Sequence, residues 1–219
     1  NWLVSLGDGA ATDEAIGQLQ LDGLRTLWFT RSPVTDTALR HLATAPSLPG
    51  LHLRSTRITD DGLRQFLPGP PPPFLDLAFT DVGDEGLRHL AQIKELRYRG
   101  LTLDLRGSRV TVAGVAEFLR TFPKPESPND LHIYMDDATV WRDRIWFRGS
   151  SVTDADLEPF RTVMSLCHVS LRETQVTDAG LEYLAELKDL ESIDLRSSNV
   201  TEEGVKRLQA RLPECRIQY

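Results

Sequence analysis

Residues 169–184 read VSLRETQVTDAGLEYL, and this stretch decides the fold because most of the chain repeats it. Its apolar residues first alternate with polar ones, as in a β-strand, and then take the three-to-four-residue spacing of a helix. The first apolar strand residue recurs at positions 4, 27, 51, 75, 103, 145, 169, 193 and 217, in steps of 23, 24, 24, 28, 42, 24, 24 and 24 residues. A fixed period in this range predicts a solenoid, in which each repeat forms one coil and stacks on the next.

Each repeat places the same kind of residue at the same position of its coil. The inward strand positions are apolar, as at Val169 and Leu171, and a small hydroxyl residue such as Thr174 follows. We expect this hydroxyl to bond backbone groups that are left unpaired where the strand ends. Two residues further on lies a second apolar column, represented by Val176, which we expect to be part of the core.

A helix start follows in most repeats. A Thr followed by Asp or Glu predicts an N-cap hydroxyl and an acid that suits the positive end of the helix dipole. The next apolar pair, such as Leu181 and Leu184, predicts the buried stripe of the helix. A Gly often precedes that stripe, where it costs about 1 kcal/mol in helix propensity. We therefore expect it to permit close approach to the neighbouring helix, at Gly62, Gly86, Gly114, Gly180 and Gly204.

This pattern resembles the leucine-rich repeat, specifically the short TDxGL-type relatives of its cysteine-containing subtype. That subtype is familiar from F-box substrate receptors and from bacterial repeat proteins. The resemblance covers nearly the whole chain, with Ser or Thr where the subtype often has Cys or Asn. It implies a curved right-handed solenoid with a concave parallel β-sheet and convex helices, and it implies no shared catalytic residues.

We therefore predict an α/β leucine-rich-repeat solenoid, or horseshoe, of about eight coils plus a terminal strand. We expect residues 1–219 to form a single domain with an irregular insert at about 121–143. Within the insert, Leu131, Ile133 and Met135 alternate with polar neighbours, as in a strand. Residues 131–135 then form either a truncated coil or one arm of a hairpin with 139–147.

The charge of the chain limits the class of partner. The formal net charge of −7 argues against generic nucleic-acid binding, which usually needs a basic excess. We found neither a signal peptide nor a membrane-spanning run, so no membrane contact is expected from this segment, and a monomer is favoured. The abrupt start at Asn1 suggests residues upstream of it.

The two cysteines, Cys167 and Cys215, occupy the same column one whole repeat apart. Adjacent strands are ~4.8 Å apart, so the pair should be separated by about 10 Å. A disulfide requires Cα atoms within about 7 Å. We therefore predict two free thiols, which slightly favours a reducing, cytoplasmic location.

The outward strand positions are the candidate functional residues, because solenoids generally bind through this surface. Two features mark them out. Exposed Trp residues are uncommon on a polar sheet, and Trp and Arg are enriched among interface hot spots. The candidate partner-binding residues are Trp28, His52, Arg54, Arg106, Arg144, Trp146, Arg148, His168, Arg172 and Arg196.

Two less specific interpretations remain open for these residues. Asp104 with Arg106, and Asp194 with Arg196, are also consistent with a solvated ladder of opposite charges that belongs to the repeat consensus. Trp146 lies beside the insert in the sequence, so it either packs beneath the insert or faces a partner. In the first case Tyr134, Asp136, Asp137 and Trp141 would cover it.

Three functional hypotheses follow. The first is a non-catalytic protein–protein interaction module that docks an acidic or carboxylate-bearing partner on the concave face. The alternative is a small-ligand module, with Trp28 or Trp146 stacking on a sugar and arginines gripping a carboxylate or phosphate. The third, an enzyme, has little support, because the histidines lack metal-type spacing and no Cys–His pair or nucleophile motif is present. No cofactor is expected.

Overall fold

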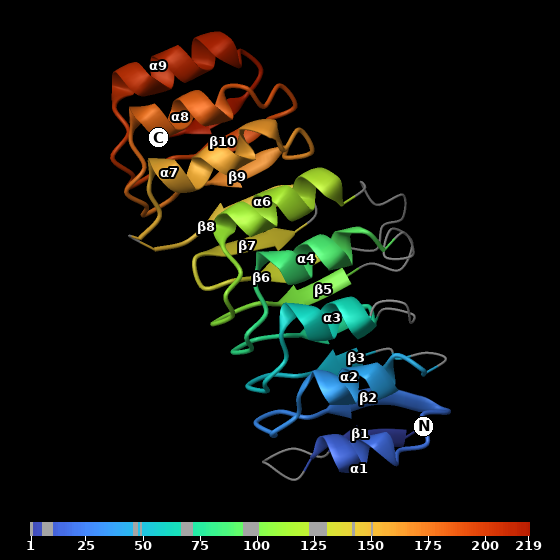
Figure 1. Cartoon of the computed structure of the whole chain (residues 1–219). Helices are drawn as coiled ribbons and strands as arrows, with labels where there is room; N and C mark the ends of the chain where they lie inside the picture. Colours follow the sequence, from blue (N-terminus) through green and yellow to red (C-terminus); the bar gives the residue numbers. More distant parts are fainter. Residues whose placement is uncertain are drawn as a thin grey trace.

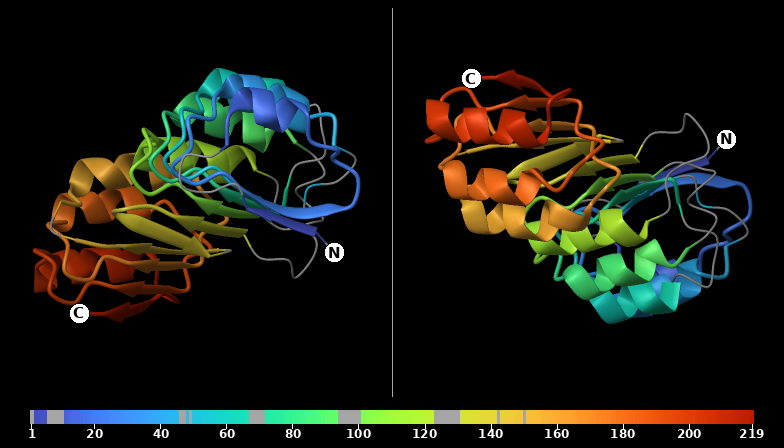
Figure 2. Two further views of the ribbon diagram at one scale, coloured as in Figure 1. Left: turned by 90° about the horizontal axis from the view of Figure 1, so that it is seen from below. Right: turned by 90° about the horizontal axis from the view of Figure 1, so that it is seen from above.

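The computed structural model describes residues 2–5, 11–45, 48, 50–66, 72–93, 101–122, 131–141, 143–149 and 151–219. These residues form an elongated stack of coils, with a row of helices on one side of a sheet (Figure 1). Seen along the stack, the direction from sheet to helices differs between the two ends, so the sheet is twisted (Figure 2).

The strands and helices alternate along most of the chain. The strands are β1 (Trp2–Ser5), β2 (Leu24–Trp28), β3 (Gly50–His52), β4 (Phe74–Asp76), β5 (Leu101–Asp104), β6 (Leu131–Tyr134), β7 (Ala138–Trp141), β8 (Arg144–Phe147), β9 (His168–Ser170), β10 (Ser192–Asp194) and β11 (Arg216–Gln218). The helices are α1 (Asp13–Gly17), α2 (Asp36–Leu42), α3 (Asp60–Phe66), α4 (Asp84–Ala91), α6 (Val112–Thr121), α7 (Asp154–Leu157) with the 3₁₀ turn η1 (Glu158–Thr162), α8 (Asp178–Leu184) and α9 (Glu202–Arg211).

One 11-stranded sheet contains all of these strands in their sequence order. Neighbouring strands pair in parallel, except that β7 is antiparallel to both β6 and β8. The regular repeats are in register, because Leu27 aligns with Leu51, and Val169 aligns with both Ile145 and Ile193. The predicted columns are therefore rows of the folded sheet.

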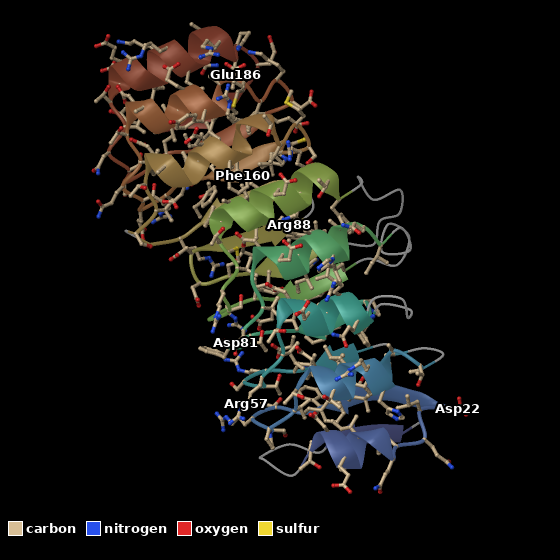
Figure 3. All side chains as sticks on the ribbon, in the orientation of Figure 1. Asp22, Arg57, Asp81, Arg88, Phe160 and Glu186 are labelled. Carbon is tan, nitrogen blue, oxygen red and sulfur yellow. The ribbon has the colours of Figure 1, made fainter. Side chains whose placement is uncertain are left out.

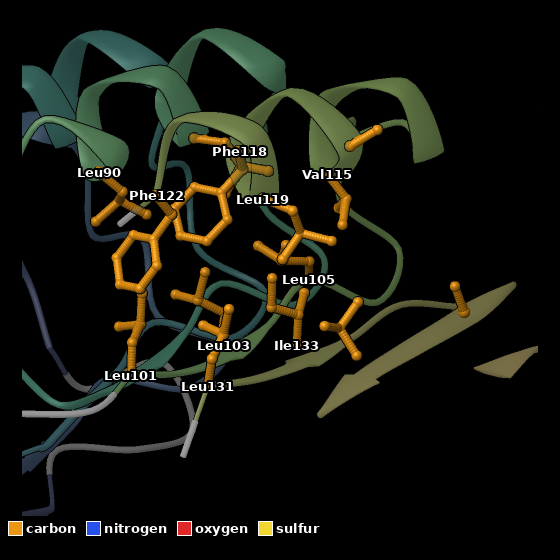
Figure 4. Packing of buried hydrophobic residues seen from close by; sticks show 14 of the residues in the cluster. Leu90, Leu101, Leu103, Leu105, Val115, Phe118, Leu119, Phe122, Leu131 and Ile133 are labelled. Atoms are coloured by element: carbon orange, nitrogen blue, oxygen red, sulfur yellow. The ribbon is translucent and has the colours of Figure 1, made fainter. Parts of the chain in front are cut away.

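The core lies between the sheet and the helices. Inward strand residues such as Leu51 and Val169 are buried, as are helix residues such as Leu181 and Leu184. In the middle of the stack, Phe118 and Phe122 of α6 stack at 4.8 Å and lie over the leucines of β5 and β6 (Figure 4). Charged side chains such as Arg88 and Glu186 instead project from the outer surface of the helices (Figure 3). The predicted core columns are confirmed.

The bend after β3, β4, β5, β9 and β10 uses a left-handed residue followed by the predicted hydroxyl. Ser55, Phe79, Glu173 and Ser197 have φ between 56° and 61°, a conformation that non-glycine residues seldom adopt. The next residue closes the bend by donating its hydroxyl to the carbonyl three residues earlier. These bonds measure 2.5–2.7 Å and are made by Thr56, Thr80, Ser108, Thr174 and Ser198.

The coils are joined by a ladder of carboxylates along the helix N-termini. The Asp at the first position of one helix accepts two hydrogen bonds from the Thr that caps the next helix, through its backbone N–H and its hydroxyl. These bonds measure 2.5–2.9 Å and join Asp13 to Thr35, Asp36 to Thr59, Asp84 to Thr111, Asp154 to Thr177 and Asp178 to Thr201. Asp60 similarly accepts from the backbone N–H groups of Gly83 and Gly86.

The Gly column follows directly from this carboxylate ladder. A Cβ atom at Gly204 would lie 2.2 Å from Oδ1 and 2.8 Å from Oδ2 of Asp178. A Cβ at Gly114 would lie 2.0 Å from Oδ1 of Asp84. The close approach predicted for these glycines is therefore an approach to the carboxylate of the preceding coil.

The ladder is interrupted between α6 and α7. Thr111 is followed by Val112, which has no carboxylate to offer the next coil. Thr153 donates instead to Asp156 of its own helix, with distances of 2.8 and 3.0 Å. Asp156 occupies the position that is Gly in coils such as those of Gly180 and Gly204. A side chain fits there because Val112 of the preceding coil places no carboxylate against it. The helix row is visibly offset at this point (Figure 1).

The described part of the insert extends the sheet. β6 pairs in parallel with β5, as a coil strand would, and is also one arm of a hairpin with β7. Asp136 accepts a 2.8 Å bond from the backbone N–H of Gly107. Asp137 accepts a 3.0 Å bond from the Ser151 hydroxyl, so the hairpin tip is tied to the coils on both sides. Residues 123–130 and 142 lie outside the described residues.

Cys167 and Cys215 are not joined in a disulfide, as predicted. Cys215 is buried, and this burial raises the pKa of its thiol to about 11. Because the thiolate is the reactive form, Cys215 has the properties of a packed structural residue.

The ladder predicts a coupling between Asp178 and Gly204 in stability. Asp178→Ala removes the two hydrogen bonds from Thr201 and the exposed ion pair with Arg207, and it should lower the free energy of unfolding by about 1–2 kcal/mol. Gly204→Ala forces a Cβ onto the carboxylate and should cost about 1–3 kcal/mol. In the double variant the clash is gone, so Gly204→Ala should there be neutral or stabilising, because Ala favours helix.

Urea unfolding of the four proteins measures this coupling as a double-mutant cycle. Asp189→Ala is the matched control, since Asp189 is an exposed carboxylate outside the ladder. Its effect should be within about 0.5 kcal/mol. Strictly additive effects of the two ladder substitutions would contradict the role assigned to this Gly.

Candidate functional site

The structure places the candidate residues on the face of the sheet opposite the helices, here called the helix-free face. They form two separate groups. Trp28 lies on β2 and Trp146 on β8, six strands apart in the sheet order. At ~4.8 Å per strand, the two rings are on the order of 30 Å apart. One small ligand therefore cannot contact both.

The first group is an aromatic stack. The rings of Trp28 and His52 are parallel, with centroids 3.4 Å apart, and Phe74 lies 4.6 Å from His52 on its other side. Register explains this arrangement, because Trp28 pairs with His52 across β2 and β3. Burial lowers the pKa of His52 below its ordinary value, even though the charge of Asp76, 3.7 Å away, acts in the opposite direction.

Beside this stack, the acidic residues are more enclosed than a solvated ladder would be. Asp76 and Asp104 are each only 8% exposed, so the expected pairing of Asp104 with Arg106 is present, but the expectation of a solvated carboxylate is wrong for Asp104. Side chains of the same and neighbouring coils, such as His52 beside Asp76 and Arg106 beside Asp104, lie against these carboxylates. Burial raises the pKa of Asp76. Burial also acts to raise the pKa of Asp104, but the hydrogen bonds and charge of Arg106 outweigh it and lower the pKa.

The arginines of this region are already engaged. Arg106 grips Asp104 through Nε and Nη2, at 2.9 and 2.5 Å. Arg54 lies 3.8 Å from Asp104, and its guanidinium lies 4.7 Å from the centre of the Phe79 ring. At the other end of the sheet, Arg196 holds Asp194 in the same two-point manner, at 2.9 and 2.6 Å.

The second group surrounds Trp146 and is here called the tryptophan–arginine patch. Trp141 of β7 lies beside Trp146 of β8, with ring centroids 6.3 Å apart, and is 44% exposed. Trp146 itself is partly exposed, so the insert flanks this ring without covering it. The patch comprises His132, Tyr134, Trp141, Arg144, Trp146, Arg148, His168 and Arg172.

Trp146 forms a wall between two hollows. The ring-lined hollow, of about 370 Å³, is bounded by His132, Tyr134, Trp141, Trp146 and Arg148, together with Thr139 and Val140. The arginine-lined hollow, of about 340 Å³, is bounded by Arg144, Trp146, His168, Arg172, Ser192 and Asp194, among others. Both are open to solvent on the helix-free face.

The arginines of the patch are weakly compensated. Arg144 lies 3.8 Å from Asp143, and Arg172 lies 3.0 Å from Glu173, its neighbour in the chain. Both pairs are well exposed, and such pairs contribute little. Within the described part of the chain, the Arg148 guanidinium makes no ion pair. Arg148 is therefore the cation of the patch most available to a partner, while Arg144 and Arg172 are held only by exposed carboxylates.

Sequence reasoning missed three residues as members of the site. His132, Tyr134 and Trp141 were expected to cover Trp146 or to alternate in an added strand, and they instead line the same face. His132 and Trp141 are aligned on β6 and β7, with rings 5.6 Å apart. The alternation of residues 131–135 was the available signal, because it already placed His132 and Tyr134 opposite the buried Leu131 and Ile133.

Among the described residues, no set of three or more His, Cys, Asp or Glu side chains is arranged to hold a metal ion. His168 interacts with Ser192 at 2.8 Å and lies 3.7 Å from Glu191. His41 lies 3.3 Å from the Leu19 carbonyl. Within the same described ranges, no helix is both long enough and apolar enough to cross a membrane.

A family model for the leucine-rich repeat matches residues 74–91, which span β4, its bend and α4. The matched unit is the same strand–bend–helix coil that stacks along the rest of the chain. The chain has the leucine-rich-repeat fold. No curated protein matches the sequence.

Several solved leucine-rich-repeat structures resemble the chain. An internalin of Listeria monocytogenes shares 14% identity, with a TM-score of 0.42, over 89% of this chain and 53% of its own. Internalin C2 of the same organism shares 20% identity, with a TM-score of 0.41, over 94% and 83%. A leucine-rich-repeat protein of Leptospira interrogans shares 15% identity, with a TM-score of 0.39, over 90% and 55%. The chain thus spans about half the length of two of these proteins.

The aromatic stack predicts a depressed pKa for His52. The unfolded chain takes up a proton near pH 6.5, whereas burial delays protonation of the folded state to lower pH. In that window the unfolded state binds more protons, so the contribution of His52 to stability is present above about pH 6.5 and is lost as the pH falls.

An NMR titration of the His52 ring should therefore give a midpoint below 6.5. Unfolding measured across the same pH range should show a smaller loss of stability for His52→Gln than for the wild type. A midpoint at or above 6.5 would mean that the charge of Asp76 outweighs burial.

Proposed function

We propose that this chain is a non-catalytic protein-interaction module that binds an acidic partner protein on its helix-free face. We further propose that residues 1–219 form one domain, and that its repeats belong to the TDxGL-type relatives of the cysteine-containing subtype. The observation that supports binding most directly is the pairing of Trp141 with Trp146 on an open face rimmed by arginines.

The two tryptophans support the proposal that a partner protein covers this surface. Large rings lose contact with water when a partner binds, and buried Trp side chains often dominate interface energetics. Trp141 and Trp146 come from adjacent antiparallel strands, so the sheet holds their backbones in place before binding. Little conformational entropy would then be lost when the partner docks.

The arginines favour an acidic partner. Arg144, Arg148 and Arg172 surround the two rings and have only weak or no ion pairs among the described residues. A partner carboxylate can therefore pair with them without displacing a strong bond. Opposite charges across an interface also accelerate encounter and set orientation.

The histidines of the face support binding more than catalysis. His52 is held between two rings, and His132 lies among Tyr134 and Trp141. Cys167 directly precedes β9, whose first residue is His168, and along extended backbone successive side chains point to opposite sides. The described geometry therefore places the aromatic and charged residues for contact with a partner surface.

The proposal predicts where a partner cross-links. A photoreactive amino acid at Thr139, on the face between Tyr134 and Trp146, should capture the partner in the native cells, whereas the same probe at Glu182, an exposed residue of α8, should not. Mass spectrometry identifies the captured protein. Capture only from the helix side would contradict the proposed face.

Once the partner is identified, titration calorimetry measures how single substitutions change its binding free energy. Trp141→Ala, Trp146→Ala and Arg148→Ala should include at least two that weaken binding by more than about 1 kcal/mol. Arg196→Ala is the matched control, because its guanidinium is already held by Asp194. Equal affinity for all four variants and the wild type would refute the assignment.

A further inference from the structure

The two hollows beside Trp146 offer different chemistry to a ligand. The ring-lined hollow presents aromatic surfaces from β6, β7 and β8, with Arg148 at its edge. The arginine-lined hollow presents Arg144, His168 and Arg172, together with the Ser192 hydroxyl, from β8, β9 and β10. The first suits an apolar side chain, and the second suits an anionic group.

Their size suits single side chains. Pockets that enclose a whole drug-sized ligand measure roughly 300–1,000 Å³ and cover most of its surface. The two hollows, of about 370 and 340 Å³, lie at the lower end of that range and are open to solvent. A ligand seated in both must therefore place one group on each side of the Trp146 ring.

The acidic groups nearest the arginine-lined hollow leave room for a further carboxylate. Asp194 is held by Arg196, and Glu173 pairs with Arg172 at 3.0 Å. Glu191 lies 3.7 Å from His168 and is 69% exposed. Exposed pairs of this kind are readily exchanged, because water and salt screen them.

We propose that the tryptophan–arginine patch binds an extended acidic peptide segment of the partner, with an aromatic or other large apolar side chain in the ring-lined hollow and an Asp or Glu carboxylate in the arginine-lined hollow. This inference rests on the proposed function. The hollows are centred near β7 and β9, two strand spacings or about 10 Å apart. An extended chain advances about 3.3 Å per residue and alternates its side chains between two faces, so the two anchors should lie two or four residues apart, about 7 or 13 Å, in the peptide.

Selection from a displayed library of random peptides on the immobilised full chain tests this spacing. Selected peptides should pair an aromatic or large apolar residue with Asp or Glu two or four positions away, because only an even spacing points both side chains at the same face. Selection in the presence of acidic oligosaccharides should give the same peptides. Failure to enrich any peptide, or enrichment without the acidic residue, would overturn the proposal.

A double-mutant cycle with one selected peptide then assigns each anchor to its hollow. Trp141→Ala and Arg172→Ala should each weaken binding at least about fivefold, measured by fluorescence polarisation. The peptide variant lacking its aromatic residue should lose the effect of Trp141→Ala and keep that of Arg172→Ala, and the variant lacking its acid should do the reverse. Trp28→Ala, an aromatic change at the far end of the same face, is the control and should leave binding unchanged.

Additive effects throughout would overturn the two-anchor arrangement. The outcome also separates this inference from the proposed function. If Trp141→Ala and Trp146→Ala weaken binding of the intact partner protein but no peptide binds, then the face docks a folded surface and the peptide proposal is wrong.

Discussion

The rest of the structure depends on the carboxylate that links one helix N-terminus to the next. The first N–H groups of a helix have no partner within it, and here an Asp from the preceding coil supplies one. The contact fixes the height and rotation of each coil on its neighbour, and it leaves no space for a side chain at Gly204 or Gly114. Six of the 32 acidic residues take part in this contact, and others, such as Asp61 and Glu85, also lie in the first turn of a helix. Part of the negative net charge therefore has a structural role at the helix starts.

The interruption of this ladder and the composition of the tryptophan–arginine patch have a common origin. Between α6 and α7 the described residues add β6 and β7 to the sheet, and no helix follows directly after either strand. Val112 breaks the ladder at the same place, and Asp156 compensates by capping its own helix. Strands that are free of the helix-to-helix constraint can carry residues outside the repeat consensus. Tyr134 and Trp141 are such residues, and both lie on the helix-free face.

Sequence periodicity predicts the structural role of a residue within its own coil. It predicts less well which residues of the next coil that residue contacts. The buried columns, the bend hydroxyls and the capping threonines follow from local pattern, so they were predictable. The partner of each ladder Asp was not, because it lies 22–27 residues away in the chain and depends on how the coils stack. The burial of Asp76 and Asp104 was missed for the same reason, since side chains of neighbouring strands enclose them. The position of Trp141 required the antiparallel pairing of β7, which no repeat of the chain exhibits.

The two aromatic groups of the helix-free face differ in how many of their rings and charges are already engaged in contacts within the chain. At the β2 end, Trp28 stacks on His52, Arg106 grips Asp104, and Arg54 lies over Phe79. A partner that binds there must compete with these internal contacts. Only the free energy by which its own contacts exceed them would contribute to binding. Around Trp146, the arginines are held weakly and the rings border open hollows. An exposed Trp alone does not distinguish the two groups, because both contain one. The difference lies in the arginines beside Trp146, which are held only by exposed carboxylates or, for Arg148, by none among the described residues, and this difference is why we propose the docking surface there.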